Sequence, residues 1–328
     1  MKYRPMKKQD VLRTGVFVDI NSVNANDLDF SLLQQQLDHL ELLSVTSVED
    51  MQDELSDYDV IITNKVKLPR DILERNRGIK LICVAATGTN NIDLQAAHEL
   101  AIRVCNVTGY ATASVVQHVF ALILTLQTRL LELTSAVRQG EWSRSPCFSL
   151  LTYPVNELAG KTMGIVGYGE LGQAVAGIAK ALGMKVLIAQ RNEQDVRGGR
   201  IALHELLPQV DVLSLHCPLT RETENLIDAK EFNLMKSSAI IINTARGGIV
   251  NEMALLNAIE DQQIAAAGID VLSVEPPPEN HPLLMAQHNN LIVTPHVAWA
   301  SQESRQRLIN EVALNIKAFN AGESRNLV

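Results

Sequence analysis

The feature that most constrains the fold of this chain is a glycine-rich turn, Gly167-Tyr168-Gly169-Glu170-Leu171-Gly172. An apolar run precedes it at residues 163–166, and an alanine-rich segment with a helical pattern follows it at residues 173–182. In such a turn the first glycine lets the chain leave a strand sharply, the second removes a side chain where phosphates approach, and the third lets the helix pack closely on the sheet. The helix N-terminus adds unpaired N–H groups and partial positive charge. The sequence therefore predicts a doubly wound α/β domain that binds the pyrophosphate of a dinucleotide.

A glycine turn with a purely structural role is the alternative interpretation. The flanking residues argue against it, because β-branched Ile165 and Val166 end the preceding run and a further apolar run occupies residues 185–189. A pyrophosphate-binding turn fits that context better than a turn that binds nothing.

Length and charge narrow the class of protein further. The chain has 328 residues, which is enough for two domains of ordinary size. Its 46% hydrophobic and 20% charged residues are typical of a soluble globular protein. The formal net charge of −8 disfavours a broad surface for nucleic acid or anionic lipid. We therefore expect neither nucleic acid nor a membrane as a partner.

The sequence also indicates a cytoplasmic location. Residues 1–10 are basic and polar without an apolar core, so no secretory signal is predicted. The most apolar long segment, residues 115–133, carries too many polar side chains for a membrane span and is interpreted as part of a long buried helix at residues 114–133. The four cysteines are widely spaced and form no C-x-x-C motif, which favours free thiols over disulfides or a metal site.

Two sets of alternating strands and helices predict two parallel sheets, each with helices on both faces. In the first set the expected strands are residues 16–20, 60–63, 81–85 and 102–105, and the expected helices are residues 28–40, 69–75 and 93–100. In the second set the expected strands are residues 163–166, 185–189, 212–215, 239–243, 266–270 and 291–294. Six strands is the number in a full dinucleotide-binding sheet. The last helix, residues 301–320, is expected to return to the first domain, which makes that domain discontinuous.

Three segments that follow late strands of the second set carry polar groups that a plain core does not need. They contain Arg246, Glu275 and His296. Each residue alone has an ordinary structural explanation, such as a helix cap, a loop carboxylate or a satisfied imidazole. In a doubly wound sheet, however, ligands bind at the carboxyl ends of the strands, so all three residues fall on the side of the dinucleotide. Their joint placement favours an active site.

Five ordered motifs carry a resemblance to a known family. They are residues 167–172, 216–220 (H-C-P-L-T), 244–252 (T-A-R-G-G-I-V-N-E), 268–276 and 294–296. With these motifs, and over nearly its whole length, the chain resembles the D-2-hydroxyacid dehydrogenases. Residues 86–93 and 114–118 are also similar to the family, and residues 150–158 and 294–299 look most like its bacterial glycerate dehydrogenases, also called hydroxypyruvate reductases.

The resemblance implies two doubly wound parallel-sheet domains. A Rossmann NAD(P)-binding domain would span residues 107–299, and a flavodoxin-like substrate-binding domain would combine residues 1–106 and 300–328. Carried over by position, the cofactor-binding residues would be Gly167, Gly169, Glu170, Leu171, Gly172, Gln190, Arg191, His216, Cys217, Pro218, Thr244, Ala245, Asp270 and Ala298. The substrate-binding residues would be Thr87, Gly88, Thr89, Tyr110 and Arg246.

The resemblance also implies roles for the three polar residues. Arg246 would bind the substrate carboxylate, because a guanidinium presents a rigid fork of donors to it. His296 would be the acid/base, since an imidazole can protonate a forming alkoxide and recover the proton in the reverse reaction. Glu275 would be its acidic partner and would favour the protonated ring.

One position departs from the pattern of NAD enzymes. Gln190 lies 18 residues after Gly172, where those enzymes usually place Asp or Glu to accept the ribose hydroxyls. Without that carboxylate a 2′-phosphate is not repelled, and Arg191 can bind one, so NADP(H) becomes an option. Alternatively, Gln190 hydrogen-bonds the ribose and Arg191 points to solvent. We expect NAD(H), which the similar glycerate dehydrogenases mostly use, and dual use as the alternative.

The implied reaction is hydride transfer between NAD(P)H and the C2 carbonyl of hydroxypyruvate or glyoxylate, which gives D-glycerate or glycolate. One alternative is the same chemistry on another 2-ketoacid such as pyruvate. Another is a dinucleotide-sensing scaffold, similar to corepressors of this fold, that binds cofactor without turnover. The family pairs through the region of the long apolar helix, so a homodimer is expected.

Overall fold

The computed structural model describes residues 11–45, 52–192, 194–195 and 197–328. These residues form two compact units, the first up to Ala111 together with Ala300–Val328, and the second from Thr112 to Trp299. The chain leaves the first unit later than the boundary expected at residue 106. Residues 106 and 107 stay in the first unit because the N–H of Asn106 donates to the carbonyl of Asn326, and that of Val107 to the carbonyl of Ala86.

The first unit is built on a parallel sheet of five strands in the order β2-β1-β3-β4-β5, which is the flavodoxin-like order. The strands are β1 (Thr14–Phe17), β2 (His39–Leu42), β3 (Val60–Thr63), β4 (Leu81–Val84) and β5 (Arg103–Cys105). Every residue of β3 and β4 is buried, as expected for central strands covered on both faces.

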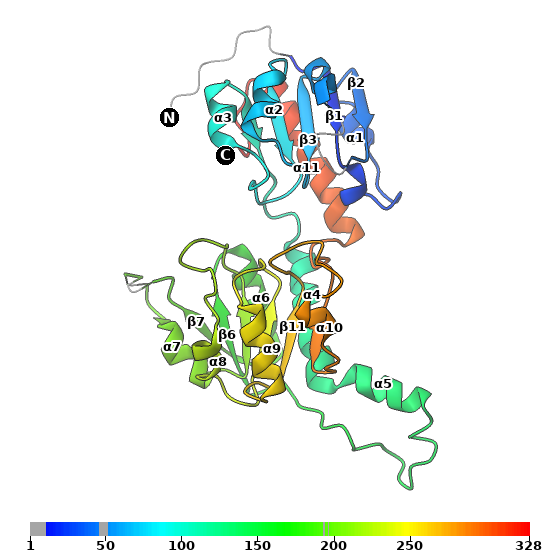
Figure 1. Cartoon of the computed structure of the whole chain (residues 1–328), viewed down its shortest axis with the longest axis vertical. Helices are drawn as coiled ribbons and strands as arrows, with labels where there is room; N and C mark the ends of the chain where they lie inside the picture. Colours follow the sequence, from blue (N-terminus) through cyan, green and yellow to red (C-terminus); the bar gives the residue numbers. More distant parts are fainter. Residues whose placement is uncertain (1–10, 46–51, 193, 196) are drawn as a thin grey trace. The chain divides into compact units, whose positions relative to one another are not determined.

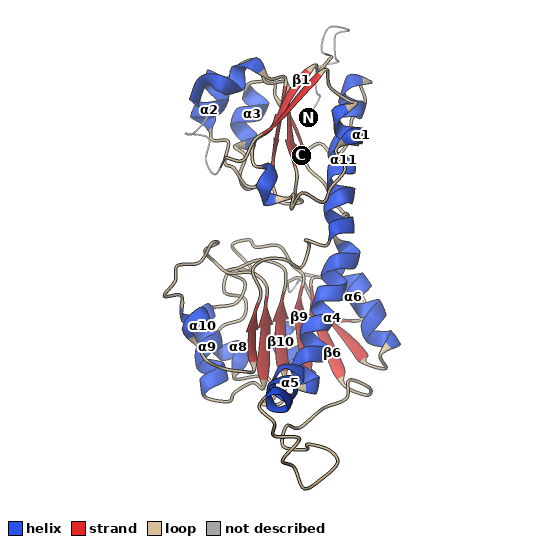
Figure 2. Ribbon diagram, turned by 90° about the vertical axis from the view of Figure 1, so that its right-hand side faces the viewer, coloured by secondary structure: helices blue, strands red, loops and turns tan. Residues whose placement is uncertain are grey.

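Helices cover both faces of this sheet. They are α1 (Ser31–Gln34), α2 (Arg70–Arg75), α3 (Leu94–Glu99) and α11 (Gln302–Asn320), with 3-10 turns at η1 (Ile20–Ser22) and η3 (Gln52–Asp57). Figure 2 shows α2 and α3 on one side of the strands and α1 and α11 on the other. The last helix therefore belongs to the first unit.

The helix expected at residues 28–40 is wrong over most of its length. Only α1 is helical, and residues 39–42 form the edge strand β2. Leu33 and Leu37 gave the segment its helical spacing, and both are buried. Leu37 packs so closely over Gly15 that a Cβ there would lie 2.6 Å from its Cδ1. The chain then extends and pairs in parallel with β1, so tertiary pairing outweighs the local helical pattern.

The second unit contains a parallel sheet of seven strands in the order β12-β11-β10-β9-β6-β7-β8. The strands are β6 (Thr162–Val166), β7 (Lys185–Ala189), β8 (Arg200–Ile201), β9 (Val212–Leu215), β10 (Ile240–Asn243), β11 (Ala266–Ile269) and β12 (Leu291–Val293). Six of them match the expected strands, and β8 was missed because it has only two residues, paired with the end of β7. The sheet reverses its strand order beside β6, which carries the glycine turn at its carboxyl end.

The helices of the second unit are α4 (Thr112–Thr128), α5 (Leu130–Arg138), α6 (Glu170–Ala181), α7 (Leu203–Leu206), α8 (Ala229–Phe232), α9 (Glu252–Glu260) and α10 (Pro282–Met285), with a 3-10 turn at η4 (Leu207–Gln209). The helix α4 packs against α6 and against strands β10 and β11. In Figure 2 it runs across the front of the sheet.

The single helix expected at residues 114–133 is broken between α4 and α5. Arg129 takes a left-handed conformation with φ 52°, and the two helices meet at an angle of 58°. The carbonyl of Gln127 accepts the N–H of Asn156 at 2.9 Å in place of the next helical partner. The chain segment at residue 156 thus ends α4, and α5 leaves the sheet in a new direction (Figure 1).

Within the described part of the chain, no single helix has both the length and the apolar character needed to cross a membrane. Only α4 and α5 taken together, as a bent pair, meet that test.

Candidate active site

The glycine turn has the geometry that a pyrophosphate needs. Gly167 has φ 92°, and a Cβ there would lie 2.5 Å from the carbonyl carbon of His216. A Cβ on Gly172 would lie 2.1 Å from the carbonyl oxygen of Gly167, so α6 starts in close contact with the turn. At Gly169, the N-cap of α6, no described heavy atom lies within 4 Å of a Cβ position. The start of α6 is therefore open beside Gly169, and the first N–H groups of a helix have no intrahelical partners and can bind an anion.

The other two predicted residues of this turn belong to the first turn of α6. Glu170 is exposed, and its Oε1 accepts the hydroxyl of Thr112 at 2.5 Å. Leu171 is half-buried. The turn is thus tied to the start of α4 through a side-chain contact.

Two buried polar atoms at the carboxyl ends of neighbouring strands have no partner among the described residues. They are Nδ1 of His216, which follows β9, and Oγ1 of Thr244, which follows β10. Burial lowers the pKa of His216 to about 4, so its ring is neutral at neutral pH. Burial also raises the pKa of the adjacent Cys217 thiol, while Pro218 is exposed and Ala245 half-buried. Orphaned buried polar atoms are rare in proteins, and a bound dinucleotide is a fitting partner for them.

The end of β7 carries an arginine-rich loop. Gln190 donates through Nε2 to the carbonyl of Asp195 at 3.3 Å. The carboxylate of Asp195 accepts from Arg197 at 2.6 and 2.7 Å, from Arg200 at 3.0 Å and from the N–H of Arg191 at 3.0 Å. The Arg197 guanidinium and then the Arg191 N–H hold the pKa of Asp195 well below its usual range. Asp195 thus engages Arg197 and Arg200, and Arg191 stands at an exposed position beside Gln190.

His296 and Glu275 form a close pair. His296 follows β12, Glu275 follows β11, and Nδ1 of the imidazole lies 2.6 Å from Oε2 of the carboxylate. An ionised carboxylate only accepts, so Nδ1 carries the hydrogen and Nε2 is left for chemistry. The other oxygen of Glu275 accepts the N–H of Leu272 at 2.9 Å, which fixes the carboxylate. Both side chains remain partly exposed, at 26% and 33%, so a substrate can reach them.

Arg246 lies in a tight turn after β10. The side chain of Asn243 holds this turn, because it donates to the carbonyl of Arg246 at 2.9 Å and accepts the N–H of Ala245 at 3.1 Å. Arg246 itself is exposed and donates through Nη1 to the carbonyl of Ala245 at 2.7 Å. A Cβ on Gly247 would lie 1.9 Å from the carbonyl oxygen of Leu272. The backbone of the Arg246 turn therefore touches the loop that leads to Glu275.

Asp270 and Ala298, both predicted to bind the cofactor, are bonded to each other. Asp270 is fully buried at the end of β11, and its carboxylate accepts the N–H of Ala298 at 2.9 Å. It also accepts the N–H of Val297 at 3.0 Å and the hydroxyl of Thr294 at 2.6 Å. In this structure Asp270 organises the segment around His296, and its contact with the cofactor stays a prediction.

The remaining substrate candidates belong to the first unit. The turn Thr87-Gly88-Thr89 follows β4, with Thr87 exposed and the other two residues half-buried. Thr87 donates to the carbonyl of Val107 at 2.9 Å, and Asn106 donates to the carbonyl of Thr87 at 2.7 Å. The half-buried Tyr110 accepts at its carbonyl from Arg307 at 2.9 Å.

Three residues with close contacts to the site were not predicted. Asn243 clamps the Arg246 turn, His118 of α4 contacts Thr294 at 3.0 Å, and Glu252 accepts the N–H of Ser273 at 2.7 Å in the loop before Glu275. His118 and Glu252 lie inside motifs that carried the resemblance, but their spacing alone gave no role. A polar residue that ends a strand of buried isoleucines, as Asn243 does, is the signal that could have found it.

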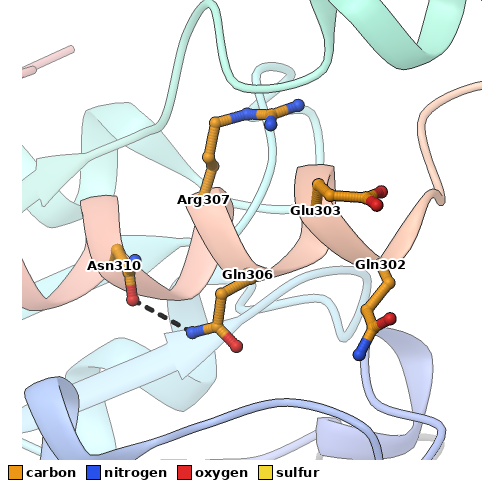
Figure 3. Close-up of a pocket in the computed structure, with 5 residues that line it drawn as sticks. All are labelled: Gln302, Glu303, Gln306, Arg307 and Asn310. Carbon is orange, nitrogen blue, oxygen red and sulfur yellow. Dashed lines mark hydrogen bonds between the residues drawn. The ribbon is translucent and has the colours of Figure 1, made fainter.

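A surface cavity of about 380 Å³ lies on the first unit, away from these residues in the sequence. Its lining comes from one face of α11, namely Gln302, Glu303, Gln306, Arg307 and Asn310 (Figure 3). It contains none of the predicted site residues. The hydrogen bond between Gln306 and Asn310, drawn in Figure 3, and those from Gln302 and Gln306 to the carbonyls of Asp27 and Asp29 indicate a structural role for this face.

A Rossmann-type sheet with an open glycine turn, beside a histidine–carboxylate pair at the ends of neighbouring strands, defines a nicotinamide-dependent oxidoreductase. Residues 120–298 match the family model described as D-isomer specific 2-hydroxyacid dehydrogenase, NAD binding domain. The chain belongs to the D-isomer specific 2-hydroxyacid dehydrogenase family.

Individual relatives are similar over almost the whole chain. A glycerate dehydrogenase of Methylorubrum extorquens is 42% identical over 95% of this chain and 98% of its own. A hydroxypyruvate reductase of Blautia hydrogenotrophica is 39% identical over 95% of this chain and 98% of its own. Among solved structures, the D-lactate dehydrogenase of Aquifex aeolicus in complex with NAD and lactic acid has a TM-score of 0.80 at 30% identity, covering 94% of this chain and 96% of its own. The protein is therefore an NAD(P)-dependent 2-hydroxyacid dehydrogenase.

Proposed function

We propose that this dehydrogenase reduces hydroxypyruvate and glyoxylate to D-glycerate and glycolate. The observation that carries the proposal is the 2.6 Å contact between Nδ1 of His296 and Oε2 of Glu275, because it leaves Nε2 as a directed proton donor at the ends of the strands. The names of the glycerate dehydrogenase and hydroxypyruvate reductase relatives support the choice of acid.

In the proposed reaction the bound nicotinamide supplies a hydride to the C2 carbonyl carbon of the ketoacid. The residues of the chain then have three tasks. Nε2 of His296 gives its proton to the carbonyl oxygen as that oxygen gains charge, and Glu275 accepts Nδ1–H and so orients the ring. Arg246 binds the substrate carboxylate with its planar fork of donors and orients the carbonyl. In the reverse direction His296 takes the proton from the hydroxyl.

We place the cofactor on the residues described above. Gly167, Gly169, Glu170, Leu171 and Gly172 would hold the pyrophosphate, and the orphaned atoms of His216 and Thr244 would bond to the nucleotide. The turn Thr87-Gly88-Thr89 is proposed to hold the substrate carboxylate through backbone N–H groups, with Tyr110 as a further contact. These assignments rest on the resemblance in sequence and on the geometry of each unit taken separately.

The cofactor preference is proposed as NAD(H), with NADP(H) as an alternative. Gln190 is fixed by its bond to the carbonyl of Asp195, so its amide can serve a ribose hydroxyl. Asp195 binds Arg197 and Arg200, which keeps those two cations away from a 2′-phosphate. Only the exposed Arg191 of this loop then remains as a candidate phosphate ligand among its described arginines. A single arginine supports modest use of NADP(H).

A second substrate is favoured by a specific observation. The structural relative from Aquifex aeolicus binds lactic acid, which is the reduced form of pyruvate. Pyruvate lacks the C3 hydroxyl of hydroxypyruvate, so the two acids test whether a polar group recognises that end of the substrate.

We further propose a homodimer in the cytoplasm. The dimer is supported by apolar side chains exposed on α5 and on the loop that follows it. The location is supported by four free cysteines, including the buried neighbours Cys83 and Cys105, which are typical of a reducing compartment.

Steady-state turnover with hydroxypyruvate, glyoxylate and pyruvate, each with NADH and with NADPH, tests the proposal. We expect the highest kcat/KM for hydroxypyruvate with NADH. His296→Ala should lower kcat by about a hundredfold to ten-thousandfold while cofactor affinity stays the same, which is the range for a general acid. A preference for pyruvate would replace the proposed substrate, and a His296→Ala enzyme within a few-fold of wild type would overturn the proposed acid/base.

A further inference from the structure

His296 sits in a backbone conformation that needs support. Its φ is 54°, in the left-handed region that residues with a side chain seldom adopt. The structure holds this turn from one side: the N–H of His296 donates to the carbonyl of Asp270 at 2.9 Å, and the next two N–H groups donate to the Asp270 carboxylate. The position of the imidazole therefore depends on the position of Asp270.

His118 completes this arrangement from α4. Its Nε2 lies 3.0 Å from Oγ1 of Thr294 and 3.4 Å from Oδ1 of Asp270. The hydroxyl of Thr294 has one hydrogen, which it gives to Asp270 at 2.6 Å, because the carboxylate can only accept. The contact with His118 must then be donated by Nε2–H of the imidazole. The hydrogens available to these groups therefore identify Nε2 of His118 as the donor to Thr294.

A second contact ties the same two segments together. Ser114, one turn before His118 on α4, donates to the carbonyl of Ala298 at 2.7 Å, and both residues are buried. The segment from Thr294 to Ala298 is therefore hydrogen-bonded to α4 at both ends, and His296 lies between these two contacts. Of these contacts, His118 is the one that reaches the Thr294–Asp270 pair.

We propose that His118 is a positioning residue for His296. It donates to Thr294, orients that hydroxyl toward Asp270, and so fixes the carboxylate that holds the left-handed turn. The inference rests on the proposed role of His296 as acid/base. His118 is not assigned a contact with substrate or cofactor; it acts through Thr294 and Asp270.

The test compares variants that keep or remove the donor. His118→Gln places an amide N–H near the position of Nε2, whereas His118→Leu fills the space without a donor. We expect His118→Leu to lower kcat about 10- to 100-fold, because a small displacement of a catalytic group has effects of that size. His118→Gln should stay within about threefold of wild type, since it keeps the hydrogen bond. Gln117→Leu, an exposed neighbour on the same helix, is the matched control and should have no effect.

A purely structural role of His118 predicts that its loss also changes KM and cofactor affinity, whereas a positioning role predicts a change in kcat alone. If His118 positions His296, the KM for the ketoacid and the affinity for NADH, measured by fluorescence titration, should change by less than about threefold in His118→Leu, because Arg246 and the glycine turn are untouched. Thr294→Val should lower kcat about as much as His118→Leu does. The double variant with both substitutions should have a kcat little lower than either single variant, since all three break the same chain of contacts.

Two results would overturn the proposal. One is a wild-type kcat in His118→Leu, and the other is additive losses in the double variant. His296→Ala is measured alongside: if its kcat falls as expected while that of His118→Leu equals the wild-type value, the positioning role fails and the proposed function stands. If His296→Ala keeps its activity, the proposed acid/base itself is wrong.

Discussion

His216 stands at the end of β9 with a ring that the fold keeps neutral. Its Nε2 lies 2.9 Å from the hydroxyl of Ser214, its Nδ1 has no described partner, and burial lowers its pKa to about 4. An unfolded chain has an ordinary histidine pKa of about 6.5. Between pH 6.5 and 4 the unfolded state therefore binds a proton that the folded state does not. Stability should fall as the pH drops through this window and level off below it.

The predicted size of this effect is about 2 kcal/mol at pH 5 relative to pH 7.5. His216→Gln keeps a polar partner for Ser214 but cannot titrate, so its loss of stability over that range should be about 2 kcal/mol smaller than that of wild type. Unfolding by urea at the two pH values, without cofactor, measures the difference. His39→Gln, on the exposed edge strand β2, is the control and should keep the full acid sensitivity. Equal sensitivity of His216→Gln and wild type would show that the ring accepts a proton in the folded state.

The residues of the site differ in how far the sequence alone indicates their roles. Gly167 and Gly172 are glycines that backbone geometry requires, since a Cβ at either would clash with neighbouring backbone, and the motif itself indicates that requirement. His296 and Glu275 were paired through topology and resemblance, and the structure brings them into contact. His118 gave no such signal, because a polar residue in an apolar helix is recognised only when its partners from a distant strand end are known. Spacing along one helix does not reveal contacts to another element.

At the scale of elements, the connection from β3 to α2 is held by one buried side chain. The carboxylate of Asp19, which follows β1, accepts the N–H groups of Asn64 at 2.9 Å, Lys65 at 2.6 Å and Val66 at 3.1 Å. Asp19 is only 4% exposed, so water cannot replace it. The turn after β3 therefore has its shape imposed by the neighbouring strand β1.

We expect Asp19→Ala to reduce the free energy of unfolding of the first unit by about 3 kcal/mol or more, because it leaves buried donors without an acceptor. Asp19→Asn keeps one acceptor oxygen and should lose roughly half as much. Hydrogen exchange should accelerate at the amides of Asn64 and Val66 before it does elsewhere in the sheet. Asp38→Ala, at an exposed position, serves as the control. Unchanged exchange at these amides in Asp19→Ala would contradict the assignment.

The elements that the sequence predicted well are those whose pattern is local. The central strands of both sheets are continuous apolar runs, and they lie where they were expected. The edge strands β2 and β8 are exposed or short, and each exists because a neighbour offers a free edge. The break at Arg129 has the same origin, since a distant segment takes the carbonyl of Gln127. Local periodicity cannot report a hydrogen bond formed by a residue far along the chain.

At the scale of the whole molecule, the second unit has an extension that its own core does not explain. Figures 1 and 2 both show α5 and the following loop reaching away from the sheet. The loop has contacts of its own, such as the bond from Trp142 Nε1 to the carbonyl of Phe148 at 2.9 Å. The large apolar side chains of α5 and of this loop nevertheless face solvent. They are Leu130, Leu131, Val137, Trp142, Phe148, Leu151 and Val155. Soluble monomers rarely expose so many in one segment.

A second copy of the chain is the partner that we propose for this extension. Phe148 is 93% and Leu151 86% exposed in the single chain, so both should become buried on dimerisation. Charged residues cannot be buried there without a partner, so we expect wild type to be a dimer and the double variant Phe148→Asp and Leu151→Asp to be a monomer at about 10 μM. Sedimentation velocity measures the masses, and Met285→Asp, an exposed apolar position on α10, should remain dimeric. The double variant should keep its fold, because neither side chain contributes to the core of the unit; a wild-type monomer at that concentration would instead mean that the extension has another occupant.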